Sequence, residues 1–148
     1  MISSCSQAPK KSDDSQGLNP VKEGTDRRSS DQGTAMGLQT VHFDFDSVNL
    51  NPDSLEILKK NAEILKSNDE IKVQIEGYCD SRGGIQYNLG LGDKRAKAVV
   101  TFLRKLGVNS SKLSTVSYGK ERPLDPSETE EAFAKNRRAN FVVTAPLN

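Results

Sequence analysis

The sequence is poor in the residues that build metal sites, and it has no strong excess of either charge. Its 148 residues include no Trp, one His and two Cys. Because His42 stands alone, and Cys5 and Cys79 lie far apart without a Cys-x-x-Cys pair, a zinc site of His and Cys is excluded. The net charge of +1 lacks the basic excess of nucleic-acid binders, and no apolar run approaches the roughly 20 residues that cross a bilayer. We therefore expect no metal, no other cofactor and no nucleic-acid partner.

The first part of the chain has little that could form a core. Residues 1–37 are rich in Ser, Asp, Gly, Lys and Gln, and their charges alternate in sign. Such a segment buries too little apolar surface to offset the entropy of ordering its backbone. We expect residues 1–37 to be a disordered tether, which as a coil would span on the order of 30 Å. Residues 38–148 are expected to form one folded domain.

In the folded part, segments in which every second residue is apolar, as in strands, alternate with segments in which apolar residues recur every three to four positions, as in helices. Asn51 before Pro52 is a typical helix start, and Gly107 is a typical helix end. The expected strands are 41–45, 71–77, 113–118 and 138–144, and the expected helices are 52–67, 88–106 and 127–136, the last capped by Ser127. The order β-α-β-α-β-α-β predicts an α+β fold. It is a two-layer sandwich with helices packed on one face of a mixed four-stranded sheet.

Five segments of the folded part occur in an order that is specific when taken together, although each is weak alone. They are Phe43–Asp46, Val73–Gly83, Asn88–Val99, Tyr118–Pro123 and Asn136–Ala139. This pattern resembles the OmpA-like peptidoglycan-binding domain family, to which the C-terminal half of outer membrane protein A belongs. The resemblance covers about residues 38–145. It implies the fold predicted above, and it implies that residues 38–148 form a wall-binding domain.

The resemblance also implies a site for meso-diaminopimelate in the peptide stem of peptidoglycan. The side chain of that amino acid ends in an ammonium and a carboxylate. An aspartate and an arginine can pair with both groups, because charge-assisted hydrogen bonds are roughly twice as strong as neutral ones. By resemblance, Asp80 takes the ammonium and Arg95 takes the carboxylate. Residues that line the site by the same carry-over are Phe45, Asp46, Asn88 and Leu91, with Arg138 adding positive charge nearby.

The chain departs from the family pattern at two places. Tyr78 and Cys79 stand where many members have His followed by Ala or Thr, and Gly90 stands where many have Ser. Tyr78 keeps a hydrogen-bond donor but carries no charge at neutral pH. Any role that needs the family's histidine is therefore absent here, and Gly90 is expected to loosen the start of its helix.

Near the N-terminus, residues 2–5 (Ile-Ser-Ser-Cys) resemble a lipobox, the site at which bacterial lipoproteins are cleaved before a cysteine that then receives lipid. Only four residues precede Cys5, whereas a signal peptide has a basic and an apolar region before its cleavage site. Either the leader lies upstream of Met1, or the match is accidental and Cys5 is an unmodified residue of a polar tail. Ser6, rather than Asp, follows Cys5, which favours the outer membrane over the inner one.

Together these features predict a lipoprotein anchored in the outer membrane at Cys5 and facing the periplasm. It would bind peptidoglycan non-covalently as part of the Tol system, dock the propeller protein of that system, and support envelope integrity and cell division. The predicted function is binding, not catalysis. An alternative assigns the same wall-binding domain to a motor stator or another envelope protein outside the Tol system.

Less specific interpretations remain for individual residues. Asp80 could only cap a turn, and Arg95 could be a solvated helix residue. Asp44 and Asp46 alternate as in a Mg²⁺ or Ca²⁺ site, but two carboxylates without a further cluster are usually structural. Cys79 would be a nucleophile only beside a base. A wall-cleaving enzyme would need a metal triad, a Cys–His pair or paired acids with shifted pKa values, and no motif of this kind is present.

Overall fold

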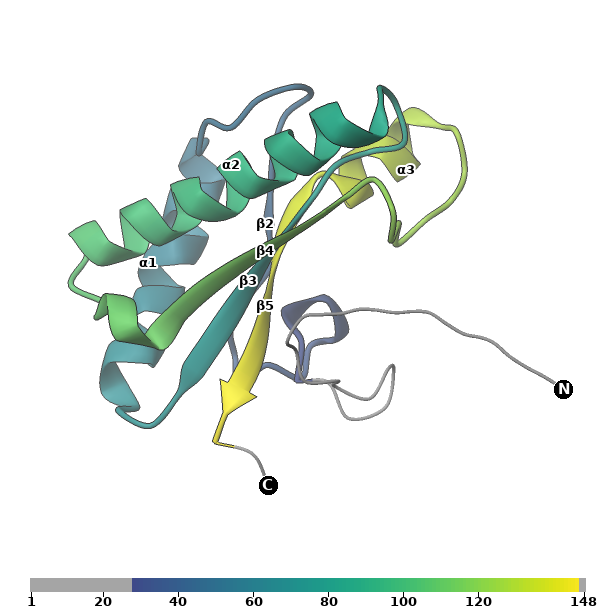
Figure 1. Cartoon of the computed structure of the whole chain (residues 1–148). Helices are drawn as coiled ribbons and strands as arrows, with labels where there is room; N and C mark the ends of the chain where they lie inside the picture. The colour runs from purple at the N-terminus through teal and green to yellow at the C-terminus, as the bar shows by residue number, and fades with distance from the viewer. Residues whose placement is uncertain (1–27, 147–148) are drawn as a thin grey trace, which may run out of the picture.

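The computed structural model describes residues 28–146, so the predicted tether up to residue 27 and the predicted lipidation site Cys5 lie outside the described residues. The predicted fold class is confirmed: three helices pack on a mixed four-stranded sheet (Figure 1). The strands are β2 (Val41–His42), β3 (Lys72–Tyr78), β4 (Leu113–Gly119) and β5 (Arg138–Ala145). The helices are α1 (Pro52–Ser67), α2 (Ile85–Lys105) and α3 (Glu130–Asn136), with short 3₁₀ turns η2 (Ser30–Gln32) and η3 (Ser110–Lys112).

The sheet has the order β2-β5-β3-β4, so the last strand of the chain lies inside it. Strand β3 pairs in parallel with β4 and antiparallel with β5, and β5 pairs antiparallel with β2. Helices α1 and α2 cover one face of the sheet (Figure 1), and apolar side chains fill the space between the layers. Each large apolar side chain buried there contributes about 1.5–3 kcal/mol. The fully buried ones include Leu58, Leu65, Ile75, Val99, Leu103 and Phe141.

Helix boundaries follow the local capping residues. Asn51 caps α1 as predicted, and its side-chain oxygen accepts a hydrogen bond from Ser54 N at 2.8 Å. The prediction of Ser127 as the cap of α3 was wrong, because Thr129 accepts the hydrogen bond from Ala132 N at 3.1 Å instead. Helix α2 begins at Ile85 rather than near residue 88, which places Gly90 inside the helix and not at its start.

The first predicted strand is shorter than residues 41–45. Strand β2 ends at His42, and Phe43 N donates a hydrogen bond to Arg137 O at 2.9 Å beyond it. The chain then turns, and Asp46 adopts a left-handed conformation with φ 53°. The residues that continue the apolar–polar alternation after His42 therefore form a loop, which reaches over the end of the sheet toward α2.

Residues 29–35, which we call the strap, belong to the folded body although the sequence placed them in the tether. Ser29 forms a β-bridge with Val142, so the strap covers the part of the β5 edge that the two-residue β2 leaves open. Asn140 Oδ1 accepts hydrogen bonds from Ser29 Oγ, Ser30 Oγ and Asp31 N, each at 2.9 Å. The folded domain thus begins at least as early as Ser29, and not near residue 38.

Helix α2 lies against β3 at a contact between two glycines. A Cβ added to Gly77 would stand 1.8 Å from the carbonyl oxygen of Gly92, and one added to Gly92 would stand 2.3 Å from Ser117 Oγ. Only residues without a side chain allow the two backbones to approach this closely. This contact sets the distance between the end of β3 and the first turns of α2, from which the functional residues project.

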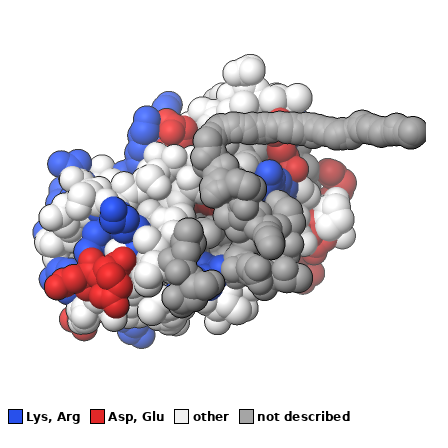
Figure 2. Space-filling model, turned by 60° about the horizontal axis from the view of Figure 1, so that its bottom comes forward, with Lys and Arg blue, Asp and Glu red and all other residues white. Residues whose placement is uncertain are grey.

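The surface carries both signs of charge in close proximity. Where Figure 2 shows the described residues, acidic and basic side chains lie beside one another and do not form an extended region of one sign that would favour a nucleic-acid backbone. Among residues 28–146, no helix combines the length and the apolar character needed to cross a membrane.

Candidate functional site

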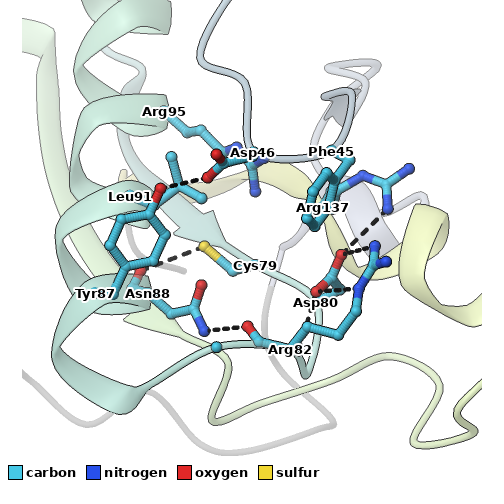
Figure 3. Close-up of a pocket in the computed structure, with 11 residues that line it drawn as sticks. Phe45, Asp46, Cys79, Asp80, Arg82, Tyr87, Asn88, Leu91, Arg95 and Arg137 are labelled. Carbon is cyan, nitrogen blue, oxygen red and sulfur yellow. Dashed lines mark hydrogen bonds and ion pairs between the residues drawn. The ribbon is translucent and has the colours of Figure 1, made fainter.

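A pocket of about 240 Å³ opens at the C-terminal end of β3, between the first turns of α2, the loop after β2 and the loop after β3 (Figure 3). It gathers six of the seven predicted wall-binding residues from three separate segments of the chain. The residues that line it are Phe45, Asp46, Cys79, Asp80, Arg82, Gly83, Tyr87, Asn88, Leu91, Arg95 and Arg137. Of the predicted set, only Arg138 is not among them.

Asp80 is a buried carboxylate held by two arginines. Its side chain is 5% exposed. Oδ1 accepts hydrogen bonds from Arg82 N at 3.0 Å and Arg82 Nε at 3.3 Å, while Oδ2 accepts from Arg82 Nη2 at 2.8 Å and Arg137 Nη1 at 3.2 Å. Burial acts to raise the pKa of Asp80, but the hydrogen bonds from Arg82 and Arg137 outweigh it and hold the pKa below its ordinary value. Asp80 is therefore an anion at neutral pH.

Arg82 is the more exposed of the two arginines that pair with Asp80. Its guanidinium lies between two aromatic rings, with its central carbon 4.2 Å from the ring centre of Phe45 and 4.2 Å from that of Phe133. Its Nη1 also lies 3.8 Å from Glu130 Oε2, and its side chain remains 35% exposed. Arg82 was not among the predicted site residues, although it lies two residues after Asp80 in the segment Val73–Gly83.

Arg95 is completely buried and organises the base of the pocket. Its Nε donates to Ser47 O at 2.8 Å, Nη1 to Tyr78 O at 3.0 Å and Nη2 to Asp44 O at 3.0 Å. Burial lowers the pKa of Arg95, yet a guanidinium remains charged at neutral pH. A guanidinium has five N–H groups, so two remain beyond these three hydrogen bonds. Arg95 thus holds the loop after β2 against the end of β3 and cannot be a simple solvated residue.

Two exposed aromatic side chains form the mouth of the pocket. Phe45 is 60% exposed and Tyr87 is 58% exposed, on opposite sides of the opening (Figure 3). The hydroxyl of Tyr87 donates a hydrogen bond to Asp46 Oδ1, which raises the pKa of Tyr87. Asn88 lies deeper, and its Nδ2 donates to Arg82 O at 2.7 Å. The walls therefore combine ring faces with fixed polar groups, an arrangement common in ligand sites.

Of the two residues that replace the family's His-Ala or His-Thr, Tyr78 lies outside the pocket and Cys79 lines it. Tyr78 is buried, and its hydroxyl bonds Glu76 Oε1 at 2.6 Å while its ring stacks on Tyr118. Burial raises the pKa of Cys79 to about 11, so its thiol is protonated at neutral pH. His42 lines a different hollow, so the described residues that line this pocket include no histidine to act as a base for Cys79.

The assignment of Arg138 to the pocket was wrong, and its neighbour Arg137 occupies that position. Arg137 Nε donates to Phe43 O at 2.9 Å, and its Nη1 reaches Asp80. Arg138 is 2% exposed and points to the strap, where its Nε pairs with Asp31 Oδ2 at 2.8 Å. Successive side chains of an extended chain point in opposite directions. The sequence could not tell which of the two arginines faces the pocket.

The sequence and the fold of the chain are similar to those of known proteins. The model of the OmpA family matches residues 42–137. The chain is 37% identical over 112 residues to the peptidoglycan-associated lipoprotein of Pseudomonas aeruginosa, covering 76% of this chain and 66% of that protein. It spans about two thirds of the length of the curated relatives that it matches first, 66%, 67% and 65%.

Solved structures with a similar fold include a lipoprotein of the same name. The peptidoglycan-associated lipoprotein from Burkholderia pseudomallei has a TM-score of 0.70 and 39% identity, over 76% of this chain and 96% of that one. The C-terminal domain of Helicobacter pylori MotB also has a TM-score of 0.70, with 25% identity over 76% of this chain and 88% of that one. The two share the fold equally well, and the lipoprotein is the more similar in sequence.

Proposed function

The chain belongs to the OmpA family, and from this premise we propose that it binds peptidoglycan non-covalently through the pocket at the end of β3. The observation that carries the proposal is the meeting of a buried carboxylate, Asp80, with the guanidinium of Arg95 in one cavity. The names of the similar lipoproteins state an association with peptidoglycan, and the charges of the pocket fit a ligand of that chemistry.

The ligand group that we propose is the side-chain end of meso-diaminopimelate, which carries an ammonium and a carboxylate on the same carbon. Asp80 receives the ammonium, and the remaining N–H groups of Arg95 receive the carboxylate. Asn88 and Leu91 shape the deeper wall, while Phe45 and Asp46 line the entrance. The pocket has three arginines and two aspartates, a formal charge of +3 − 2 = +1. A zwitterionic ligand fits this nearly balanced charge better than a cation does.

Pelleting with insoluble peptidoglycan tests this site. Wild-type protein should sediment with the wall material, and Asp80→Asn should remain largely in the supernatant. Asp93→Asn is a matched control, because Asp93 is an exposed α2 residue paired with Lys97 at 2.9 Å outside the pocket. Equal sedimentation of wild type and Asp80→Asn would refute the proposed site.

We further propose that Cys5 carries lipid, so that the protein connects the outer membrane to the wall from the periplasmic side. The support is the lipobox-like Ile-Ser-Ser-Cys sequence and the lipoprotein names of the relatives. Metabolic labelling with palmitate in the native host should mark the wild type and not Cys5→Ser. Equal labelling of both would contradict the anchor.

The proposed protein partner is the propeller protein of the Tol system, which would place this chain in envelope integrity and cell division. The first eight curated relatives all bear the name peptidoglycan-associated lipoprotein, which favours this assignment over a motor stator. Purified propeller protein should be retained by the immobilised chain, and excess soluble muropeptide should change that retention if the two surfaces overlap. No retention at micromolar concentrations would contradict the partner.

The proposed activity is binding and not cleavage of the wall. Within the described residues, no three or more His, Cys, Asp or Glu side chains stand close enough together to hold a metal ion. The raised pKa of Cys79, about 11, makes it a poor nucleophile at neutral pH. Muropeptides incubated with the protein should be recovered intact by mass spectrometry, and the appearance of shorter products would contradict a pure binder.

A further inference from the structure

The hydrogen bonds of Asp80 impose a condition on any ammonium that binds there. An ionised carboxylate has about four lone-pair sites. Asp80 already accepts four hydrogen bonds, three from the backbone and side chain of Arg82 and one from Arg137. An incoming ammonium must therefore take the place of one of these donors, and the identity of that donor decides what else the ligand needs.

The side chain of Arg82 is the donor that can be replaced. Arg137 is 12% exposed and is fixed at its other end by the hydrogen bond from Nε to Phe43 O. The side chain of Arg82 is 35% exposed, whereas that of Asp80 is 5% exposed. The backbone N–H of Arg82 remains bonded to Oδ1 when the side chain leaves, so the carboxylate keeps its orientation.

We propose that Arg82 is a specificity-determining residue of the wall-binding site, because it exchanges Asp80 for the carboxylate of the ligand. In this exchange the ligand ammonium pairs with Asp80, and the ligand carboxylate accepts the hydrogen bonds that Arg82 has lost. A carboxylate can accept from both Arg82 and Arg95, since it has about four lone-pair sites. Phe45 and Phe133 keep the guanidinium in place during the exchange.

The consequence is a preference among peptide stems. A stem with diaminopimelate supplies both charges and leaves no ion unpaired. A stem with lysine at the same position supplies only the ammonium, so Arg82 loses its hydrogen bonds to Asp80 and keeps only the longer ion pair with Glu130 at 3.8 Å. A lost charge-assisted hydrogen bond corresponds to roughly 10- to 100-fold in affinity. The inference rests on the proposed wall-binding function and names the chemical feature that the site selects.

The test compares two soluble disaccharide tetrapeptides, one with diaminopimelate and one with lysine at the third position, by calorimetry on the whole protein. Arg82→Met removes the donors and keeps an apolar chain between the two rings. Wild type should bind the diaminopimelate stem at least roughly tenfold more tightly than the lysine stem. Arg82→Met should bind the lysine stem more tightly than wild type does, so the ratio of the two dissociation constants should be closer to one. Arg82→Lys, which keeps the charge, should retain most of the preference.

Arg122→Met is the matched control, since Arg122 stacks on Tyr118 at 4.0 Å and does not line the pocket. The ratio of its dissociation constants for the two stems should equal that of wild type. An unchanged ratio in Arg82→Met, or an equal loss of both stems, overturns the role of Arg82 while leaving wall binding intact. If wild type binds neither stem, the proposed function itself fails, and the inference fails with it.

Discussion

Arg137 and Arg138 are adjacent in the chain and each pairs with an aspartate, yet the two ion pairs lie in regions with different roles. Arg137 meets Asp80 at 3.2 Å in the pocket, next to open space and exposed aromatic rings. Arg138 meets Asp31 at 2.8 Å under the strap, where both side chains are less than a tenth exposed. The same type of ion pair thus lines an open pocket in one region and forms a closed, buried contact in the other.

The difference lies in the surroundings of each pair. Under the strap, Arg138 also donates to Asn136 O at 3.1 Å and stacks on the ring of Tyr78 at 3.7 Å. These partners are fixed parts of the fold. In the pocket, the aspartate is shared with Arg82, which is the most exposed of its partners. Under the proposed function, a ligand group replaces the exposed partner of Asp80, whereas both members of the Asp31–Arg138 pair are buried and stay paired.

Breaking the strap pair should have the largest effect, and it should fall on stability. Arg138→Ala leaves Asp31 buried without its counter-ion, and removal of one partner of a buried pair costs about 3–5 kcal/mol. Urea unfolding monitored by circular dichroism should show this loss. Affinity for the diaminopimelate stem, measured at low temperature where the variant is folded, should stay within about threefold of wild type. A large loss of affinity at unchanged stability would show that Arg138 acts in binding and not in stabilising the fold.

Removing the pocket carboxylate should act mainly on binding. Asp80→Asn should weaken binding of the diaminopimelate stem by about 2–4 kcal/mol, roughly 30- to 1,000-fold in the dissociation constant. The measurement is calorimetry, with Asp93→Asn as control. Arg95→Ala is a poor probe, because it also leaves the carbonyl groups of Ser47, Tyr78 and Asp44 without their donor. Arg95→Lys is the better variant, since it retains charge at the base of the pocket.

A substitution at the contact between Gly77 and Gly92 should reduce both the stability of the fold and the affinity of the pocket. In Gly77→Ala the new methyl group would meet the Gly92 carbonyl at 1.8 Å, so α2 must shift, and overpacking of this kind costs about 1–3 kcal/mol. The shift should also move Asn88, Leu91 and Arg95 and weaken binding. Gly90→Ala is a matched control of opposite sign, because nothing lies within 4 Å of its added Cβ inside α2. It should stabilise the protein by about 0.5–1 kcal/mol.

The smallest effect should appear in the pH dependence of stability. The folded-state pKa of Asp80 lies below its ordinary value of 3.8, so its charged form stabilises the fold at neutral pH. That contribution is fully present above the unfolded-state pKa, and it is lost as the pH falls through the lower folded-state pKa. The stability difference between wild type and Asp80→Asn should be constant above about pH 5 and should shrink in acid. A difference that grows in acid would have the wrong sign.

Local signals predicted most of the fold. The cap at Asn51 and the alternating strand segments are short-range features, and the structure contains the elements they predict. The strap was missed because its stability comes from contacts with Asn140, about 110 residues away, and its own sequence is polar. The loop after β2 was taken for strand because its alternation continues past His42, although the backbone turns to reach α2.

The pocket was predicted from motif order and not from geometry. That route brought Asp80, Arg95 and their neighbours to one cavity, but it could not count hydrogen bonds. Three features depend on side-chain direction and packing. They are the complete burial of Arg95, the orientation of Arg137 rather than Arg138 toward the pocket, and the four hydrogen bonds to Asp80. Arg82 could have been noticed as the second charged residue of the motif, yet its sandwich between Phe45 and Phe133 joins segments that are distant in the sequence.

The position of β5 inside the sheet determines the order in which this domain can fold. Residues 138–145 follow all the other described helices and strands in the sequence, yet β2, β3 and the strap all pair with them. Contacts between such distant residues require the closure of long loops, which slows folding. While the ribosome is still making the chain, α1, α2 and the parallel β3–β4 pair have no β5 to complete their core. A ribosome-bound chain that ends before residue 138 should therefore remain protease-sensitive, and resistance should appear only after residues 138–145 emerge.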